Sequence, residues 1–151
     1  RMDNTRTMKF VRRDYIREVE NLDGYKVFMA KANGTGAFGE TLTPPIVGEP
    51  SVGNTETFIS IGEFYTLSEA MALKKYIATK FVRALLGALK TTQDITPEKW
   101  KFVPQQDFSE TSDIDWSRSV EEIDAFLYKK YKLTDAEICF INEKVQAMKD
   151  V

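Results

Sequence analysis

The sequence has 151 residues, no histidine and a single cysteine, Cys139. Without histidine the chain cannot form a Ser-His-Asp triad, a Cys-His dyad or a histidine-ligated zinc site. A single cysteine excludes an intrachain disulfide framework and a cysteine cluster for metal, and it fits a reducing cytoplasm. No window holds the roughly 18 apolar residues that a membrane-spanning helix needs. Because the first residue is Arg1 and not Met, we expect a fragment of a longer protein.

The composition that is present suits a folded domain, with 42% hydrophobic residues and a net charge of −2. The charge alternates in blocks: residues 1–33 and 67–101 are basic, whereas residues 34–66 and 102–151 are acidic. The overall charge therefore says nothing about nucleic acid, while the two basic blocks are compatible with a phosphate-binding surface. A helical domain can also segregate charge to this degree by chance.

Two segments alternate polar and apolar side chains, as half-buried strands do: residues 25–31 and residues 55–61. Between them, residues 30–55 hold five glycines and three prolines. That composition predicts a long loop or a set of short irregular strands. We expect the two alternating segments to form a small irregular mixed sheet.

Three capping boxes mark the starts of helices: Thr66–Glu69, Ser119–Glu122 and Thr134–Glu137. The first predicts one long helix over residues 67–90. The other two predict a helical hairpin over residues 119–150.

These elements predict an α+β fold, in which a small irregular mixed sheet packs on a long amphipathic helix and a C-terminal helical hairpin follows. We expect residues 1–104 to form the α+β unit and residues 105–151 to form a polar linker and the hairpin. On a helical wheel of the long helix, apolar side chains take one half. The other half forms a basic outer face that includes Lys75, Lys80 and Arg83.

Three motifs have simpler explanations than the chemistry they suggest. The run Gly34–Gly39 matches the G-x-G-x-x-G pattern of nucleotide-binding loops, but the residues after it cannot start the helix which that fold needs. The acidic residues between 113 and 124 resemble a nuclease metal site, yet acids in a first helical turn are explained by the helix dipole. Cys139 is expected beside the core of the last helix, as a small hydrophobe without chemistry.

A set of runs occurs in a specific order: Lys31–Glu40, Gly48–Ser51, Thr55–Gly62, Tyr76–Phe81, Lys90–Ile95, Trp100–Phe108, Ile114–Ser117, Ile123–Asp124, Leu127–Tyr131 and Leu133–Ile138. Together they resemble the C-terminal region of bacterial restriction–modification enzymes. In that family an adenine-specific DNA methyltransferase, sometimes fused to an endonuclease, precedes this region. The resemblance covers nearly the whole chain from Lys9 onwards. A weaker similarity relates residues 76–104 to the end of the target-recognition domains of type I specificity subunits.

The resemblance implies that this part grips duplex DNA and reads its sequence, while a methyltransferase elsewhere in the parent flips an adenine out of the helix. The sequence has no Asn/Asp-Pro-Pro-Tyr motif, no glycine loop for the methionine cofactor and no Pro-Asp…Asp/Glu-x-Lys nuclease core. We therefore expect a non-catalytic fragment without a metal or cofactor of its own. S-adenosylmethionine and magnesium would belong to the parent enzyme.

On this interpretation the phosphate contacts come from basic side chains: Arg12, Arg13, Lys31, Lys75, Lys80 and Arg83. Base readout comes from polar side chains in loops: Asn33, Thr35, Asn54, Gln93 and Asp94. The expected partners are double-stranded DNA and the methyltransferase or nuclease domains of the parent chain, in the cytoplasm and without a membrane.

Two alternatives stay open. In the first, the fragment is a docking module whose hairpin packs on the catalytic domains of the parent, and its acidic C-terminal block supports this because it repels DNA. In the second, the chain is a metal-dependent nuclease that uses Asp113, Asp115 and Glu121.

Overall fold

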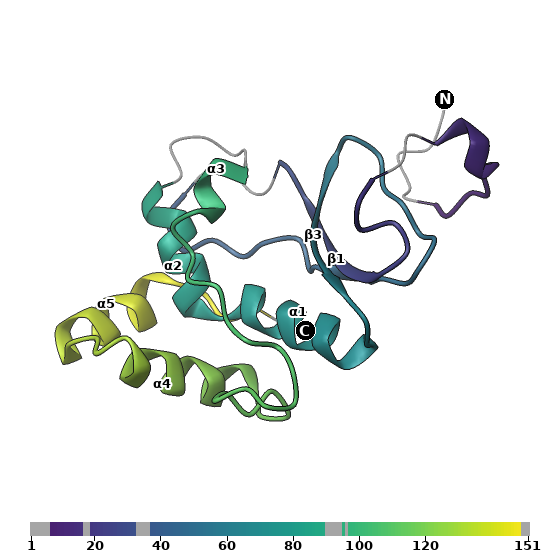
Figure 1. Cartoon of the computed structure of the whole chain (residues 1–151). Helices are drawn as coiled ribbons and strands as arrows, with labels where there is room; N and C mark the ends of the chain where they lie inside the picture. The colour runs from purple at the N-terminus through teal and green to yellow at the C-terminus, as the bar shows by residue number, and fades with distance from the viewer. Residues whose placement is uncertain (1–6, 17–18, 33–36, 90–94, 96, 149–151) are drawn as a thin grey trace.

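The computed structural model describes residues 7–16, 19–32, 37–89, 95 and 97–148. A small sheet and the main helices share one hydrophobic core, so the predicted α+β class is confirmed. Figure 1 shows the sheet on one side of α1 and α4 on the other. The elements follow in this order: η1 (Arg13–Tyr15), β1 (Tyr25–Ala30), β2 (Ile46–Gly48), β3 (Phe58–Phe64), α1 (Leu67–Ala78), α2 (Lys80–Leu89), α3 (Pro97–Trp100), α4 (Val120–Lys130) and α5 (Asp135–Lys144).

The three strands lie in the order β2-β1-β3, and β1 pairs antiparallel with both neighbours. The expectation of a mixed sheet is therefore wrong. A parallel pair needs a long crossover, usually a helix, and no α-helix precedes β3 in the described residues. The strand predicted over 25–31 is confirmed as β1. The one predicted over 55–61 begins later, because the Phe58 N–H donates to the Thr55 carbonyl at 3.0 Å and makes a turn there.

Strand β1 is buried on both faces. Val27 and Met29 belong to the core, on the face that α1 covers. On the other face, the Lys26 ammonium donates to the carbonyl oxygens of Leu22, Gly24 and Glu49 at 2.8, 2.9 and 2.8 Å. Lys26 is only 1% exposed, and this burial lowers its pKa. One lysine thus ties two loops over the outer face of the sheet.

The single helix predicted over 67–90 is two helices, because the backbone turns at Thr79. Thr79 has an extended ψ of 148°, and its hydroxyl donates to the Tyr76 carbonyl at 2.7 Å and accepts the Val82 N–H at 3.2 Å. A side-chain oxygen that accepts a bond from a residue three positions ahead is an N-cap. Thr79 therefore ends α1 and starts α2 within one residue.

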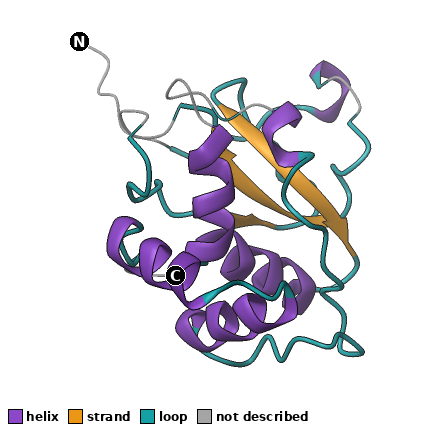
Figure 2. Cartoon of the chain, turned by 90° about the vertical axis from the view of Figure 1, so that its left-hand side faces the viewer, coloured by secondary structure: helices purple, strands orange, loops and turns teal. Residues whose placement is uncertain are grey.

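All three predicted capping boxes are present, at Thr66, Ser119 and Thr134. The hairpin of α4 and α5 is confirmed, and its apolar side chains join the core of the sheet and α1. Figure 2 shows most of the helical turns packed together beside the strands. The predicted division at residue 104 stays a prediction, although residues on both sides of it share this core.

The connection between α4 and α5 closes with a Schellman motif. The Leu133 N–H donates to the Tyr128 carbonyl at 2.9 Å, and the Lys132 N–H donates to the Lys129 carbonyl at 3.1 Å. Lys132 lies in the left-handed region with φ 55°, at the position where this motif usually has glycine. A lysine there carries backbone strain that glycine would not.

Residues 105–118 contain no helix or strand, as a linker would, but they pack firmly on α1. The Phe108 ring lies 5.8 Å from that of Tyr76 and 5.2 Å from that of Trp116. The Gln106 amide donates to the hydroxyl of Tyr131 at 2.7 Å. This segment therefore fastens α4 to α1.

Candidate functional site

Residues that flank the predicted DNA-reading segments in the chain are bonded to one another at one end of the sheet. The Lys31 N–H, just past β1, donates to the Thr57 carbonyl at 3.0 Å, and the Lys31 carbonyl accepts the Ile95 N–H at 2.8 Å. The Asn54 amide donates to the carbonyls of Thr55 and Phe58 at 2.9 and 3.1 Å. Segments more than 60 positions apart in the chain are thus bonded side by side.

Lys31 and Asn54, both exposed, are the predicted site residues that the structure places at this end. Four other predicted base-reading residues lie outside the described residues: Asn33, Thr35, Gln93 and Asp94. In the chain, Lys31 comes shortly before Asn33 and Thr35, and Ile95 comes directly after Gln93 and Asp94. Lys31 and Ile95 are the two residues joined by the 2.8 Å hydrogen bond. We call Lys31, Asn54, Thr57 and Ile95 the loop-end cluster.

The predicted basic helix face is largely occupied by internal contacts. The Lys75 ammonium donates to the carbonyls of Trp116 and Arg118, both at 2.9 Å. The Lys80 ammonium donates to the Asn142 side chain at 3.1 Å. Both lysines hold the C-terminal segment against the helices rather than standing free on a surface.

The expectation that Arg83 lies on an exposed face is wrong, because its residue is only 3% exposed. The turn at Thr79 and the packing of α4 against α2 cover the side that a continuous helix would have exposed. The Arg83 Nε–H donates to the Ala78 carbonyl at 3.2 Å, while Nη1 and Nη2 have no partner in the described residues. A phosphate contact by Arg83 is therefore corrected to a buried structural role.

Arg12 and Arg13 are exposed and paired with acids. Arg12 bonds Asp14 at 2.6 Å, and Arg13 bonds Asp23 at 2.7 Å. Asp23 precedes β1 whereas Lys31 follows it, so the two arginines and the loop-end cluster lie at opposite ends of that strand. The structure does not bring the predicted phosphate anchors together into one surface.

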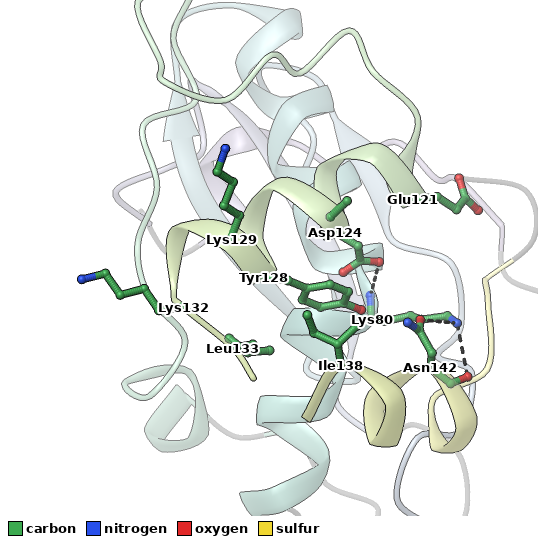
Figure 3. A pocket seen from close by; sticks show the side chains of 10 residues that line it. Lys80, Glu121, Asp124, Tyr128, Lys129, Lys132, Leu133, Ile138 and Asn142 are labelled. Atoms are coloured by element: carbon green, nitrogen blue, oxygen red, sulfur yellow. Dashed lines mark hydrogen bonds between the residues drawn. The ribbon is translucent and has the colours of Figure 1, made fainter. Parts of the chain in front are cut away.

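A second site, which the sequence did not predict, is a hollow of about 570 Å³ between α4, α5 and the start of α2. Figure 3 shows the Tyr128 ring and Ile138 between Lys129 and Lys132 on one side and Lys80 with Asn142 on the other. At its floor the Asp124 carboxylate accepts the backbone N–H groups of Lys80 and Phe81, both at 2.8 Å. Asp124 thereby caps α2 from another helix.

Burial shifts the pKa values of the ionisable groups at the floor of the hollow. It raises the pKa of Asp124 to about 6, although two backbone N–H groups and the Arg83 charge oppose that shift. Burial also lowers the pKa of Arg83 and raises that of the Tyr128 hydroxyl, which has no hydrogen-bond partner in the described residues. The carboxyl group at the floor of the hollow, Asp124, thus has a pKa close to neutral pH.

The titration of Asp124 predicts a pH effect on stability. Its folded pKa of about 6 lies above the ordinary 3.8, so folding favours its protonated form. The stability that this group contributes is full below pH 3.8 and is lost as the pH rises towards 6. Asp124→Asn keeps an acceptor oxygen without the charge. We expect its stability relative to wild type to rise by about 2 kcal/mol between pH 4 and pH 7.

Urea unfolding of both proteins at several pH values in this range measures the difference. Carboxylates with lowered pKa values, such as Asp115 and Glu137, change stability in the opposite direction. They are common to both proteins, so their effect cancels in the comparison. A difference between the two proteins that does not change with pH would contradict the prediction.

Two of the three acidic residues of the nuclease alternative form local ion pairs. Asp113 pairs with Lys130 at 2.8 Å, and Asp115 pairs with Arg118 at 3.1 Å. Across the described ranges, no three His, Cys, Asp or Glu side chains are grouped as a metal ion would require. Cys139 is exposed and not in the core, which corrects its predicted burial; its thiol donates to Glu143 at 3.4 Å, and this contact raises its pKa.

Comparison of the chain with protein-family models, with curated proteins and with solved structures found no match in any of the three. Among the described residues, none of the helices has the length and apolar character needed to span a bilayer.

The sequence reasoning missed the hollow and the residues that shape it. Asp124 was grouped with other acids of a first helical turn, yet its carboxylate bonds the start of α2, 44 positions away along the chain. Its place in the buried stripe next to Ile123 and Leu127 was the one available signal. An acid on the apolar side of a helix needs a partner from another element.

Proposed function

We propose that the chain is a DNA-sequence-recognition fragment of a restriction–modification enzyme, which binds duplex DNA and carries out no chemistry itself. The observation that carries the proposal is the loop-end cluster. The loops from which base readout is expected start from residues bonded to one another at one end of the sheet. Loops held on a rigid sheet are a common way to present recognition side chains. The family resemblance of the sequence supports the same function.

The contacts of the basic side chains change which of them we propose as phosphate contacts. Lys31 is exposed beside the proposed reading loops and is its first phosphate contact. Arg12 and Arg13 remain available as a second contact region, provided that DNA phosphates replace their present acidic partners. Lys75, Lys80 and Arg83 are removed from the phosphate set, since Lys75 and Lys80 are hydrogen-bonded within the chain and Arg83 is buried.

In this proposal the catalytic steps belong to the parent chain. A methyltransferase there would use S-adenosylmethionine on a flipped adenine, and a nuclease, if the parent has one, would use magnesium. The fragment would supply affinity and register along the duplex. Its working place would be the cytoplasm.

A charge reversal at Lys31 tests the proposal. We expect wild type to bind a pool of randomised duplexes with micromolar affinity at about 50 mM salt and much more weakly at about 200 mM. Lys31→Glu should weaken binding about tenfold at the lower salt. Fluorescence anisotropy measures both, and sequencing of the retained duplexes reports base preference.

Lys129→Glu is the matched control, because it changes the charge equally on α4, away from the sheet. It should leave DNA affinity within about twofold of wild type, since only cations near the phosphates contribute strongly. Equal weakening by both variants would mean nonspecific attraction and would overturn the assignment of the loop end. Absence of binding at low salt would overturn the proposal for this fragment.

A docking role is the second candidate, and one observation favours it. Four large apolar side chains between Met8 and Tyr15 are more than 60% exposed, and Phe10 is fully so. Exposed apolar side chains gathered in one segment are typical of an interaction surface. The hairpin originally expected to dock has its apolar face buried against α1 and α2, so the N-terminal segment is the better docking candidate.

A further inference from the structure

The hollow between α4 and α5 has the composition of a small-molecule site. Its volume of about 570 Å³ falls in the range of 300–1,000 Å³ that is typical of ligand pockets. Ala125, Tyr128, Leu133 and Ile138 make most of its wall apolar. Polar groups stand at its rim, so one end of a ligand would meet apolar surface and the other would meet charge.

The rim charge is predominantly positive. Lys129 and Lys132 line the hollow and are exposed, and no carboxylate of the described chain pairs with either. Lys130, between them in sequence, points elsewhere and pairs with Asp113. Lys80 lies on the opposite side, where its ammonium group donates to the Asn142 side chain (Figure 3).

The backbone at Lys132 adds an independent observation. Its left-handed φ of 55° closes the Schellman motif, where glycine would be unstrained. Strained backbone of this kind clusters at functional sites, and Lys132 lines the hollow. Its side chain starts at the rim of the hollow and points outward (Figure 3).

We propose that this hollow binds a small amphipathic monocarboxylate. The apolar part of the ligand lies on Tyr128, Leu133 and Ile138. Lys129 and Lys132, whose ammonium groups point outward in Figure 3, turn towards the ligand's carboxylate at the rim. This site is separate from the loop-end cluster and does not depend on DNA binding.

The two acids in the lining determine the ligand's charge. The Asp124 carboxylate is matched by two backbone N–H groups at the start of α2, whereas Glu121 is exposed at the rim. The lining holds three lysines and two acids, a net charge of +1 (3 − 2), which a singly charged carboxylate neutralises. Ten residues line the hollow, fewer than the roughly 20–30 per partner that form a protein interface, which favours a small molecule.

Octanoate is a suitable probe, and octan-1-ol is its uncharged match. In ¹H–¹⁵N NMR titrations of the whole chain, octanoate should shift the amides around Ala125, Tyr128 and Leu133, with a dissociation constant on the order of 1 mM or below. Octan-1-ol should bind at least about fivefold more weakly, because it lacks the charge that the lysines attract.

Two variants separate binding from folding. Lys132→Gly should raise the melting temperature by about 2–4 °C through relief of strain, and yet weaken octanoate binding about fivefold. Ser51→Gly is the matched control: Ser51 also has a positive φ, of 64°, but it lies in the loop after β2. It should stabilise the protein and leave octanoate binding unchanged.

Ala125→Phe should fill the hollow and abolish the octanoate shifts, whereas Ala136→Phe, on an exposed site of α5 outside the lining, should not. Equal affinity for the acid and the alcohol would overturn the proposal. So would shifts centred elsewhere, or octanoate binding that is unaffected by both Lys132→Gly and Ala125→Phe.

Discussion

Replacing Leu127 with alanine is expected to lower the free energy of unfolding of the whole chain by about 3 kcal/mol. Leu127 is 0% exposed, and it belongs to the same core as Val27 of β1 and Ile77 of α1. The truncation removes apolar contacts and leaves a cavity that rigid neighbours fill only in part. Because α4 contacts α1, and α1 contacts the sheet, the loss should reach β1 as well as the hairpin.

Hydrogen exchange measured peptide by peptide tests this expectation. Protection of β1 and of α5 should fall by the same amount in Leu127→Ala, as it does within one cooperative unit. Phe126→Ala is the control, since the neighbouring side chain is 40% exposed and its loss should change stability by less than about 1 kcal/mol. If only α4 and α5 lost protection, residues 105–151 would fold as a separate unit, as the division at residue 104 predicts.

The parts of the fold that the sequence predicts are those decided by neighbouring residues. A capping box joins positions only three apart, and all three boxes are present. The alternation in 25–31 likewise depends on a short stretch, and β1 is found there. Local hydrogen bonds and side-chain periodicity suffice for such elements.

The parts that the sequence did not predict depend on distant residues. Threonine is acceptable within a helix, so Thr79 by itself does not predict a helix break. The break depends on Asp124 of α4, whose carboxylate accepts the first two N–H groups of α2. Because the break was missed, the helical wheel placed Arg83 on the surface. The lesson is that a wheel drawn through an unrecognised helix end assigns the wrong face to the residues beyond it.

The candidate site follows the same division. Lys31 and Asn54 could be chosen as exposed loop residues from composition alone. The position of Lys31 beside Ile95 could not, because it depends on a hydrogen bond between segments 64 positions apart. The hollow between α4 and α5 was equally inaccessible, since it is formed by three helices whose relative placement no short motif encodes.

Lys26→Met is expected to destabilise the protein by about 3 kcal/mol, although methionine nearly matches the length and apolar character of the lysine stem. The ammonium group makes three hydrogen bonds to backbone carbonyls, and bonds that involve a charged group contribute about 1.5–3 kcal/mol each. Relief from burying the charge offsets part of that loss. The carbonyls of Leu22 and Glu49 keep one other donor each, Ser51 and Val52, which also limits the effect.

Chemical unfolding of Lys26→Met beside Lys31→Met measures this effect, because Lys31 follows the same strand and is exposed. The control should stay within about 0.5 kcal/mol of wild type. The loss at Lys26 should be accompanied by faster hydrogen exchange at Ser51, whose N–H donates to the Leu22 carbonyl in the loop that the ammonium holds. Similar stability of the two variants would show that apolar packing, and not the buried charge, holds these loops on the sheet.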